Sequence, residues 1–232
     1  MAKLLLQGET RIAGASTPVT PHKRGRSRPE EPMDAIETLM NEHRRIEHAL
    51  DALVAFADEV RRKTTDDKEE LGRFVTFIRE FADAHHHGKE EAILFAAMVE
   101  AGFPRNGGPI AVMLSEHDQG RAYVRVLAEL SAKQAAWTVE DRQRLAEAAY
   151  GYANLLRAHI HKEDAILYPM AEQRLPPEAL ARVSADCDDY EAKRISSGEL
   201  ERLQRLSEEL LARHAPLSRD EPSPRPQFSG CC

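Results

Sequence analysis

Two stretches of this chain decide its fold: HHGKEEAILF at residues 86–95 and HIHKEDAILY at residues 159–168. Aligned at an offset of 73, they are identical at six of their ten positions. Each has a histidine followed four residues later by a glutamate. Residues spaced in this way lie on the same face of a helix, with Cβ atoms about 5–6 Å apart. Both stretches therefore predict a helix that presents an imidazole and a carboxylate side by side.

A weaker repeat lies upstream of each stretch. LMNEH at residues 39–43 aligns with MLSEH at residues 113–117 at an offset of 74. These segments end at His43 and His117, which precede the first histidines of the repeated stretches, His86 and His159, by 43 and 42 residues. Chance can place one histidine and one glutamate on a helix, but it rarely places the same set twice at nearly the same separation. The chain therefore predicts one helical hairpin used twice, with pseudo-twofold packing.

Apolar residues recur at spacings of three and four along four long segments. We expect helices over about residues 34–57, 67–97, 110–127 and 138–170, followed by a shorter pair at 178–194 and 199–213. Glycines and prolines between the second and third segments, and Pro176 with Pro177 after the fourth, break the pattern. Four long helices joined by short breaks are typical of an up-down-up-down bundle. The predicted fold class is all-α: a four-helix bundle with additional C-terminal helices.

Hydrophobic periodicity also divides the chain into parts. Residues 1–32 and 215–232 lack it, and we expect both to be disordered tails. Residues 33–175 are expected to form the bundle, and residues 176–214 a C-terminal helical extension.

Composition and charge exclude several classes of protein. With 32 basic and 39 acidic residues, the 232-residue chain carries a formal net charge of −7, which argues against nucleic acid as a partner. A run of about 18 apolar residues is absent, so we expect no membrane partner. Three cysteines, two of them at positions 231 and 232, cannot form a disulfide framework. We expect a cytoplasmic protein that is a monomer or a homodimer.

The run of histidines at positions 85–87 contains one predicted ligand. An α-helical trace places His86 on the apolar stripe and His87 above Asp83 and Glu80, on a water-facing side. The repeat independently aligns His86 with His159, so His86 is the predicted ligand. The remaining histidines are expected at the surface or in supporting positions: His22, His48, His85, His87, His161 and His214.

Six side chains are expected to converge inside the bundle: His43, His86, Glu90, His117, His159 and Glu163. Four neutral imidazoles and two carboxylates, without sulfur, suit iron, manganese or zinc. Six ligands are too many for one tetrahedral ion, and they suit two octahedral ions that share bridging carboxylates. The alternative is a bundle whose buried polar groups satisfy one another by hydrogen bonds. It is disfavoured because an unpaired buried glutamate costs several kcal/mol.

Four motifs carry a resemblance: EHR at 42–44, HHGKEE at 86–91, EHD at 116–118 and HIHKED at 159–164. Over about residues 33–175, the chain resembles the hemerythrin-like family, also called the HHE cation-binding domain. This resemblance implies a non-haem di-iron centre, with an oxo or hydroxo bridge, in a four-helix bundle; manganese and zinc are the less favoured metals. It also implies roles in O2 binding, oxygen or iron sensing, iron handling, or chemistry with nitric oxide and peroxide.

One position departs from the oxygen-carrying hemerythrins, which have a second histidine four residues after the first on the third helix. Here that position is Arg121, so the fifth histidine is missing. Two residues are candidates for the replacement ligand: Glu47, the repeat partner of Arg121, and Tyr152, seven residues before His159. Alternatively, Glu47 and Arg121 form an ion pair over the site, and Tyr152 is a core aromatic residue hydrogen-bonded near the metals. An inward-pointing Arg121 would favour an anionic peroxide, so Arg121 and Tyr152 are the predicted catalytic residues.

Three functions are compatible with these residues. The first is a di-iron protein that binds or reacts with O2 or peroxide, with peroxide disproportionation as its enzymatic form. The second is a sensor or store of iron or oxygen, in which metal occupancy controls the stability of the bundle. The third is a structural or partner-binding bundle that holds zinc. The first is favoured because it uses the open coordination position.

Overall fold

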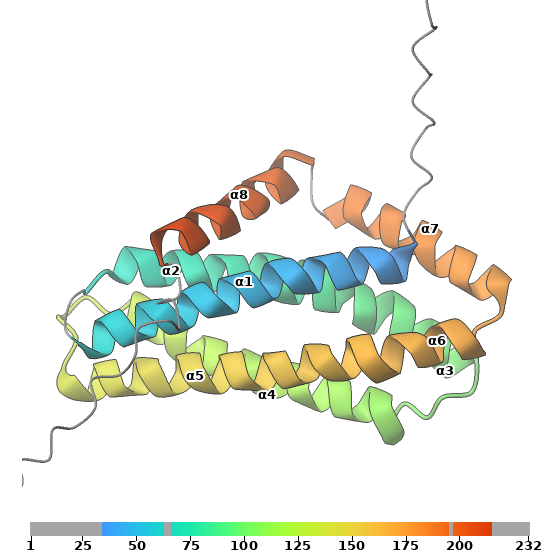
Figure 1. Ribbon diagram of the computed structural model, residues 1–232, viewed down its shortest axis with the longest axis horizontal. Coiled ribbons are helices and arrows are strands. Elements are labelled where there is room, and N and C mark those ends of the chain that lie inside the picture. The colour runs from blue at the N-terminus through green and yellow to red at the C-terminus, as the bar shows by residue number, and fades with distance from the viewer. Residues whose placement is uncertain (1–33, 63–65, 195–196, 215–232) are drawn as a thin grey trace, which may run out of the picture. The chain divides into compact units, whose positions relative to one another are not determined.

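Helices account for every regular element that the structure, a computed structural model, describes in residues 34–62, 66–194 and 197–214 (Figure 1). The chain divides into units Met1–Pro32 and Met33–Cys232, and the described helices all lie in the second unit. The elements are α1 (Ala35–Arg61), α2 (Lys68–Phe77), η1 (Ile78–His87), η2 (Glu90–Leu94), α3 (Phe95–Glu100), α4 (Gly108–Ser131), α5 (Val139–Lys162), η3 (Glu163–Leu167), α6 (Tyr168–Arg174), α7 (Pro177–Arg194) and α8 (Ser197–Arg213). The predicted all-α fold is confirmed. The expectations for the two tails lie outside the described residues.

Four long helical segments form the bundle. The first is α1, the second is the continuous run α2-η1-η2-α3, the third is α4, and the fourth is the continuous run α5-η3-α6. α1 packs against α5 and η1, α2 packs against α4, and α4 packs against α5, so the four segments close a ring (Figure 1). Because short connections join successive segments, neighbours in the chain run antiparallel, as the up-down-up-down prediction requires.

Side-chain caps fix where these helices begin. Thr138 accepts a hydrogen bond from the backbone N–H of Asp141, and the Asp141 side chain accepts one from the Thr138 N–H, which completes a capping box at the start of α5. Asp67 caps α2 by accepting from the Glu70 N–H, and Asp34 caps α1. After α3, Gly102 takes a φ of 96°, a left-handed conformation that favours glycine.

A polar layer divides the apolar core of the bundle into two clusters. On α1, Leu39 belongs to one cluster and Ile46 to the other, and His43 lies between them. The other three segments of the bundle cross the layer in the same way. Packed apolar side chains therefore hold the polar layer from both sides and limit the access of water to it.

The C-terminal extension covers one side of the bundle. α7 packs against α1 and η2, and its Ala179, Val183 and Cys187 join one apolar cluster. α8 packs against α1, α2 and η1, and its Leu203 and Leu210 join the other (Figure 1). None of the helices in the described residues combines the length and apolar character needed to cross a membrane.

Candidate metal centre

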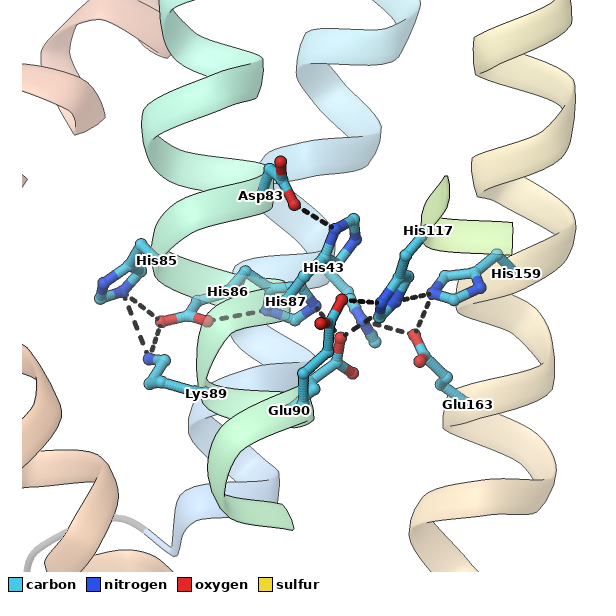
Figure 2. Close-up of polar contacts among 12 residues, drawn as sticks. His43, Asp83, His85, His86, His87, Lys89, Glu90, His117, His159 and Glu163 are labelled. Atoms are coloured by element: carbon cyan, nitrogen blue, oxygen red, sulfur yellow. Dashed lines mark hydrogen bonds and ion pairs between the residues drawn. The ribbon is translucent and has the colours of Figure 1, made fainter. Parts of the chain in front are cut away.

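Seven buried side chains converge in the polar layer (Figure 2). They form two groups in which the potential ligand atoms all lie within 4.8 Å of one another. One group is His43, His86, Glu90 and Glu163, and the other is His87, Glu90, His117 and His159. The structure thus brings together all six side chains of the expected cluster, adds His87, and places Glu90 in both groups.

Glu163 connects the two hairpins. Its Oε2 lies 3.1 Å from Nε2 of His159, on the same helix, and 3.3 Å from Nε2 of His43, on the opposite hairpin. Two adjacent ligands, each about 2 Å from one ion, are separated by about 3 Å. The 3.3 Å between Glu163 and His43, which belong to the same group, is therefore compatible with two ligands of one cation, and His159 belongs to the neighbouring group.

Glu90 occupies the equivalent position in the first hairpin. Its Oε2 lies 3.7 Å from Nε2 of His86 and 3.6 Å from Nε2 of His117. Each repeated glutamate therefore lies between a histidine of its own hairpin and one of the other. The pseudo-twofold arrangement expected from the sequence extends to the site itself.

The helix changes its hydrogen-bonding pattern at both glutamates. The N–H of Phe95 bonds to the carbonyl of Glu90, and the N–H of Tyr168 bonds to the carbonyl of Glu163, each five residues back. π-Helical turns are rare in proteins, and those that occur are often found at functional sites. The repeat therefore includes a matched backbone irregularity that sequence periodicity does not reveal.

A third π-helical segment explains the position of His87. In η1 the N–H of Gly88 reaches the carbonyl of Asp83, five residues back, so the period of 3.6 residues no longer holds. His87 is 5% exposed, and its ring stacks on His117 with ring centroids 3.9 Å apart. The prediction that His87 faces water is wrong for this reason. His87 supplies the fifth imidazole that the third helix lacks.

Each of these five histidines directs its other ring nitrogen, Nδ1, at a carboxylate. The pairs are His43 with Asp164 (2.7 Å), His86 with Glu42 (2.8 Å), His87 with Asp83 (3.4 Å), His117 with Glu91 (2.7 Å) and His159 with Glu116 (3.0 Å). An Nδ1–H that donates to a carboxylate leaves the Nε2 lone pair free, orients the ring and raises the basicity of the ligand nitrogen. All five rings are thus prepared to bind a cation through Nε2.

These outer carboxylates also obey the repeat. Glu42 and Glu116, each just before the first histidine of a hairpin, hold the second histidine of that hairpin. Glu91 and Asp164, each just after a repeated glutamate, hold the first histidine of the opposite hairpin. Sequence reasoning did not identify these outer carboxylates. The alignment of Glu42 with Glu116, and of Glu91 with Asp164, could have indicated them. The outer carboxylates cross-link the two hairpins around the site.

Several atoms of the cluster have no hydrogen-bond partner among the described residues. They are Nε2 of His86, Oε2 of Glu90, and both carboxylate oxygens of Glu163, all buried. Burial of a polar atom without a partner costs about 1–3 kcal/mol, and more for a charged group. One cation within each group would satisfy these atoms, so the residues present fit a metal centre.

The charges of the cluster support this fit. Burial and the neighbouring Glu163 raise the pKa of Glu90 above its usual value. Burial also acts to raise the pKa of Glu163, but His159 and His43 outweigh it and hold that pKa well below the usual value. Burial and the charge of His43 lower the pKa of His86 to about 4, so this imidazole is neutral at pH 7, the form that binds metal.

The model of the hemerythrin HHE cation binding domain matches residues 34–171 of this chain. The chain belongs to the hemerythrin family. Neither the curated proteins nor the solved structures include a significant match to the chain. The hemerythrin domain, with its clustered histidines and glutamates, indicates a cation-binding protein.

Within this hemerythrin domain, Tyr168 is a site residue that sequence reasoning did not single out. Its hydroxyl donates to Oε1 of Glu90 at 2.6 Å and lies 3.4 Å from Nε2 of His43. The repeat partner of Tyr168 is Phe95, which has no hydroxyl. The Tyr168–Phe95 difference was the only sign in the sequence that Tyr168 has a polar role. As a result, a tyrosine hydroxyl contacts Glu90, and no equivalent hydroxyl comes from Phe95.

Glu47 and Arg121 do not form the ion pair considered above, because each pairs with other residues. Glu47 pairs with Arg44 at 2.7 Å on the partly exposed side of α1, outside both ligand groups. The Arg121 guanidinium binds Asp83 and Glu91, each at 2.7 Å. These carboxylates hold the guanidinium at the outer layer of the hemerythrin domain, where it touches the partner of His117 rather than the ligand cluster.

A cleft of about 130 Å³ leads to one side of the centre. Its lining includes His87, His117 and Tyr152, with Val124 and Leu156 among its apolar walls and Arg121 as one of its charged residues. Tyr152 is buried, and burial, followed by the charge of Asp83, raises the pKa of its hydroxyl. In this hemerythrin domain, Tyr152 therefore lines a passage to the cluster and keeps its proton at neutral pH.

Proposed function

We propose that this protein holds two iron ions and binds or converts O2 or peroxide at them. The observation that carries the proposal is the pair of ligand groups that share Glu90, together with the unpartnered buried atoms between them. Zinc offers no redox chemistry, and manganese suits an imidazole-rich set of donors less well than iron does. Bound iron would supply Lewis acidity and reversible electron transfer at an open coordination position. We further propose that the protein acts in the cytoplasm, as a monomer or homodimer.

The chain's own residues would divide the work as follows. His43, His86 and Glu163 would hold one ion, and His87, His117 and His159 the other. Glu90 would lie between the ions, and the Tyr168 hydroxyl would hold its second oxygen in place. The five outer carboxylates keep the imidazoles oriented whether or not an ion is bound.

The cleft beside His87 and His117 sets the size of the ligand. A volume of about 130 Å³ has room for a diatomic molecule or a peroxide, since about 10–15 Å³ by the same measure is enough to hold one water. Apolar walls favour a small ligand of low charge. Arg121 acts here as a positioning residue, because its contact with Glu91 orients His117.

Oxygen evolution tests the enzymatic form of the proposal. Iron-loaded protein is expected to release O2 when hydrogen peroxide is added, and the oxidised protein should absorb in the near-ultraviolet, as oxo-bridged di-ferric centres do. His117→Ala is expected to abolish oxygen release, because it removes a ligand at the end of the cleft. A colourless protein that purifies with zinc and evolves no oxygen would contradict the proposal.

Tyr152→Phe tests the role of the cleft hydroxyl. We expect peroxide turnover to fall by about 10²-fold, the lower range for a positioned proton donor, while the iron content stays at two. The matched control is Tyr123→Phe, which removes a hydroxyl from a partly exposed tyrosine on α4. Equal turnover in the two variants would exclude Tyr152 from the reaction.

A second function, metal sensing, is favoured by the same unpartnered buried atoms. Without cations they destabilise the centre of the bundle, so metal occupancy would control its folding. A metal-binding protein without peroxide turnover would favour this second function.

A further inference from the structure

A buried lysine lies beside the candidate metal centre. The ammonium group of Lys89 donates to Oε1 of Glu42 at 2.5 Å and to Oε1 of Glu191 at 2.7 Å, and its side chain is 1% exposed. It also lies 3.2 Å from Nε2 of His85. Glu42, His85 and Glu191 form a cluster that has the geometry of a cation site. The Lys89 ammonium, drawn beside His85 in Figure 2, serves as the cation of this cluster, which is therefore an ion-pair network and not a third metal site.

This network connects helix α7 to a ligand histidine. Glu191 lies on α7, and Glu42 uses its second oxygen, Oε2, to accept from Nδ1 of His86 at 2.8 Å. The path from α7 to the centre is therefore Glu191, Lys89, Glu42 and His86, with a direct polar contact at each step. Burial would raise the pKa of Glu42, but His85, His86 and Lys89 hold it well below its usual value, which keeps the carboxylate charged.

A second contact holds α7 against η1, close to the Lys89 network. The hydroxyl of Tyr190 donates to the carbonyl oxygen of Ala84 in η1 at 2.8 Å. A Cβ atom on Gly88 would lie only 2.0 Å from this hydroxyl, so glycine is what allows α7 to approach. The other repeat has His161 at the equivalent position.

The second hairpin, which α7 does not cover, shows how the Lys89 network would look without α7. Lys162, the repeat partner of Lys89, binds Glu116, the repeat partner of Glu42. Among the described residues, Lys162 has no second glutamate partner equivalent to Glu191, and its side chain is 34% exposed, against 1% for Lys89. The same lysine–glutamate–histidine series therefore exists in both hairpins, but α7 covers only the first.

We propose that α7 controls metal retention on one side of the centre, through Glu191 and Lys89 as positioning residues for His86. While α7 is docked, Glu42 is held from both ends and His86 keeps its ligand orientation. When α7 is released, the ion at His43, His86 and Glu163 leaves faster, while the ion at His87, His117 and His159 is unaffected. Because coupling between two sites is reciprocal, metal binding also holds α7 against the bundle. This inference rests on the proposed metal centre.

Release of iron(II) to a colorimetric chelator tests the coupling under anaerobic conditions. Glu191→Gln removes the charge at the α7 end of the network, at a residue that is one-third exposed and unnecessary for the core. We expect one of two release phases, with half of the amplitude, to become about tenfold faster, the lower range for partners beyond the metal ligands. Asp186→Asn is the matched control, because it removes one exposed charge from the same helix and should leave both phases unchanged.

A second variant and a second measurement separate coupling from a general loss of structure. Gly88→Ala displaces Tyr190 without changing any charge, and we expect it to accelerate the same phase. Amide hydrogen exchange in residues 177–190 should slow when iron binds the unmodified chain and Asp186→Asn, but not Glu191→Gln. If Glu191→Gln releases iron like Asp186→Asn, or if both phases accelerate equally, the coupling is wrong. If the unmodified chain binds no iron, the proposed function fails as well.

Discussion

The Glu90→Gln variant is expected to bind less than one iron ion per chain, against the two expected for the unmodified chain. Glu90 is the only side chain in both ligand groups of the described residues, so its replacement weakens both sites at once. An amide lacks the charge of the carboxylate and cannot bridge two cations. The measurement is iron content per chain after loading with excess iron(II) and removal of unbound metal.

Two controls sharpen this experiment. Glu47→Gln changes the other glutamate that the sequence offered as a ligand, and we expect this variant to keep two ions because Glu47 pairs with Arg44 outside the cluster. The metal-free Glu90→Gln variant should be more stable than the metal-free unmodified chain, since a neutral amide costs less to bury than a carboxyl group whose Oε2 has no hydrogen-bond partner. Two ions retained by Glu90→Gln would show that Glu90 does not bridge.

Saturating iron is expected to raise the unfolding midpoint of the unmodified chain by about 8–16 °C. A ligand at 1,000 times its dissociation constant stabilises the native state by about 4 kcal/mol, and each kcal/mol shifts the midpoint by about 2–4 °C in a domain of 150–250 residues. The physical origin is the set of buried oxygens and nitrogens that have no partner without the cation. Thermal unfolding followed by circular dichroism, with and without iron, measures the shift.

Glu90→Gln provides the comparison for this shift. Its midpoint should change by less than about 2 °C when iron is added, because a cation without its bridging ligand gains little from the folded state. An equal rise in the two proteins would mean that iron stabilises the chain at some other place. In that case the unpartnered atoms of the polar layer would need a different explanation.

The sequence predicted the bundle and six members of the cluster because both depend on periodicity. The offset of 73 aligned Glu90 with Glu163, and the helical spacing of four placed each glutamate beside its histidine. Such patterns record which residues share a helix face. They are reliable wherever the helix keeps 3.6 residues per turn.

His87 was mispredicted because that period fails in η1. One extra residue per turn rotates the positions upstream of His87, so an α-helical trace no longer identifies its face. Glu47 and Tyr152 were considered as replacements for the missing fifth histidine because the same regular α-helical period was assumed. A run of three histidines on one helix was itself a hint, since an α-helix directs three successive side chains to different faces.

The contacts of α7 could not be predicted from the repeat at all. Lys89 and Lys162 are aligned and identical in sequence, yet one is buried under Glu191 and the other is partly exposed. The difference depends on how residues about 100 positions apart pack in space. Periodicity carries no information about such a contact.

Anomalous X-ray diffraction at the iron absorption edge, from crystals of the iron-loaded protein, tests the central claim most directly. The account predicts two peaks per chain, one about 2 Å from Nε2 of His43 and His86, and one about 2 Å from Nε2 of His117 and His159. The Glu90 carboxylate should lie between them. A single peak, a peak in the Lys89 network, or an empty polar layer would contradict the account.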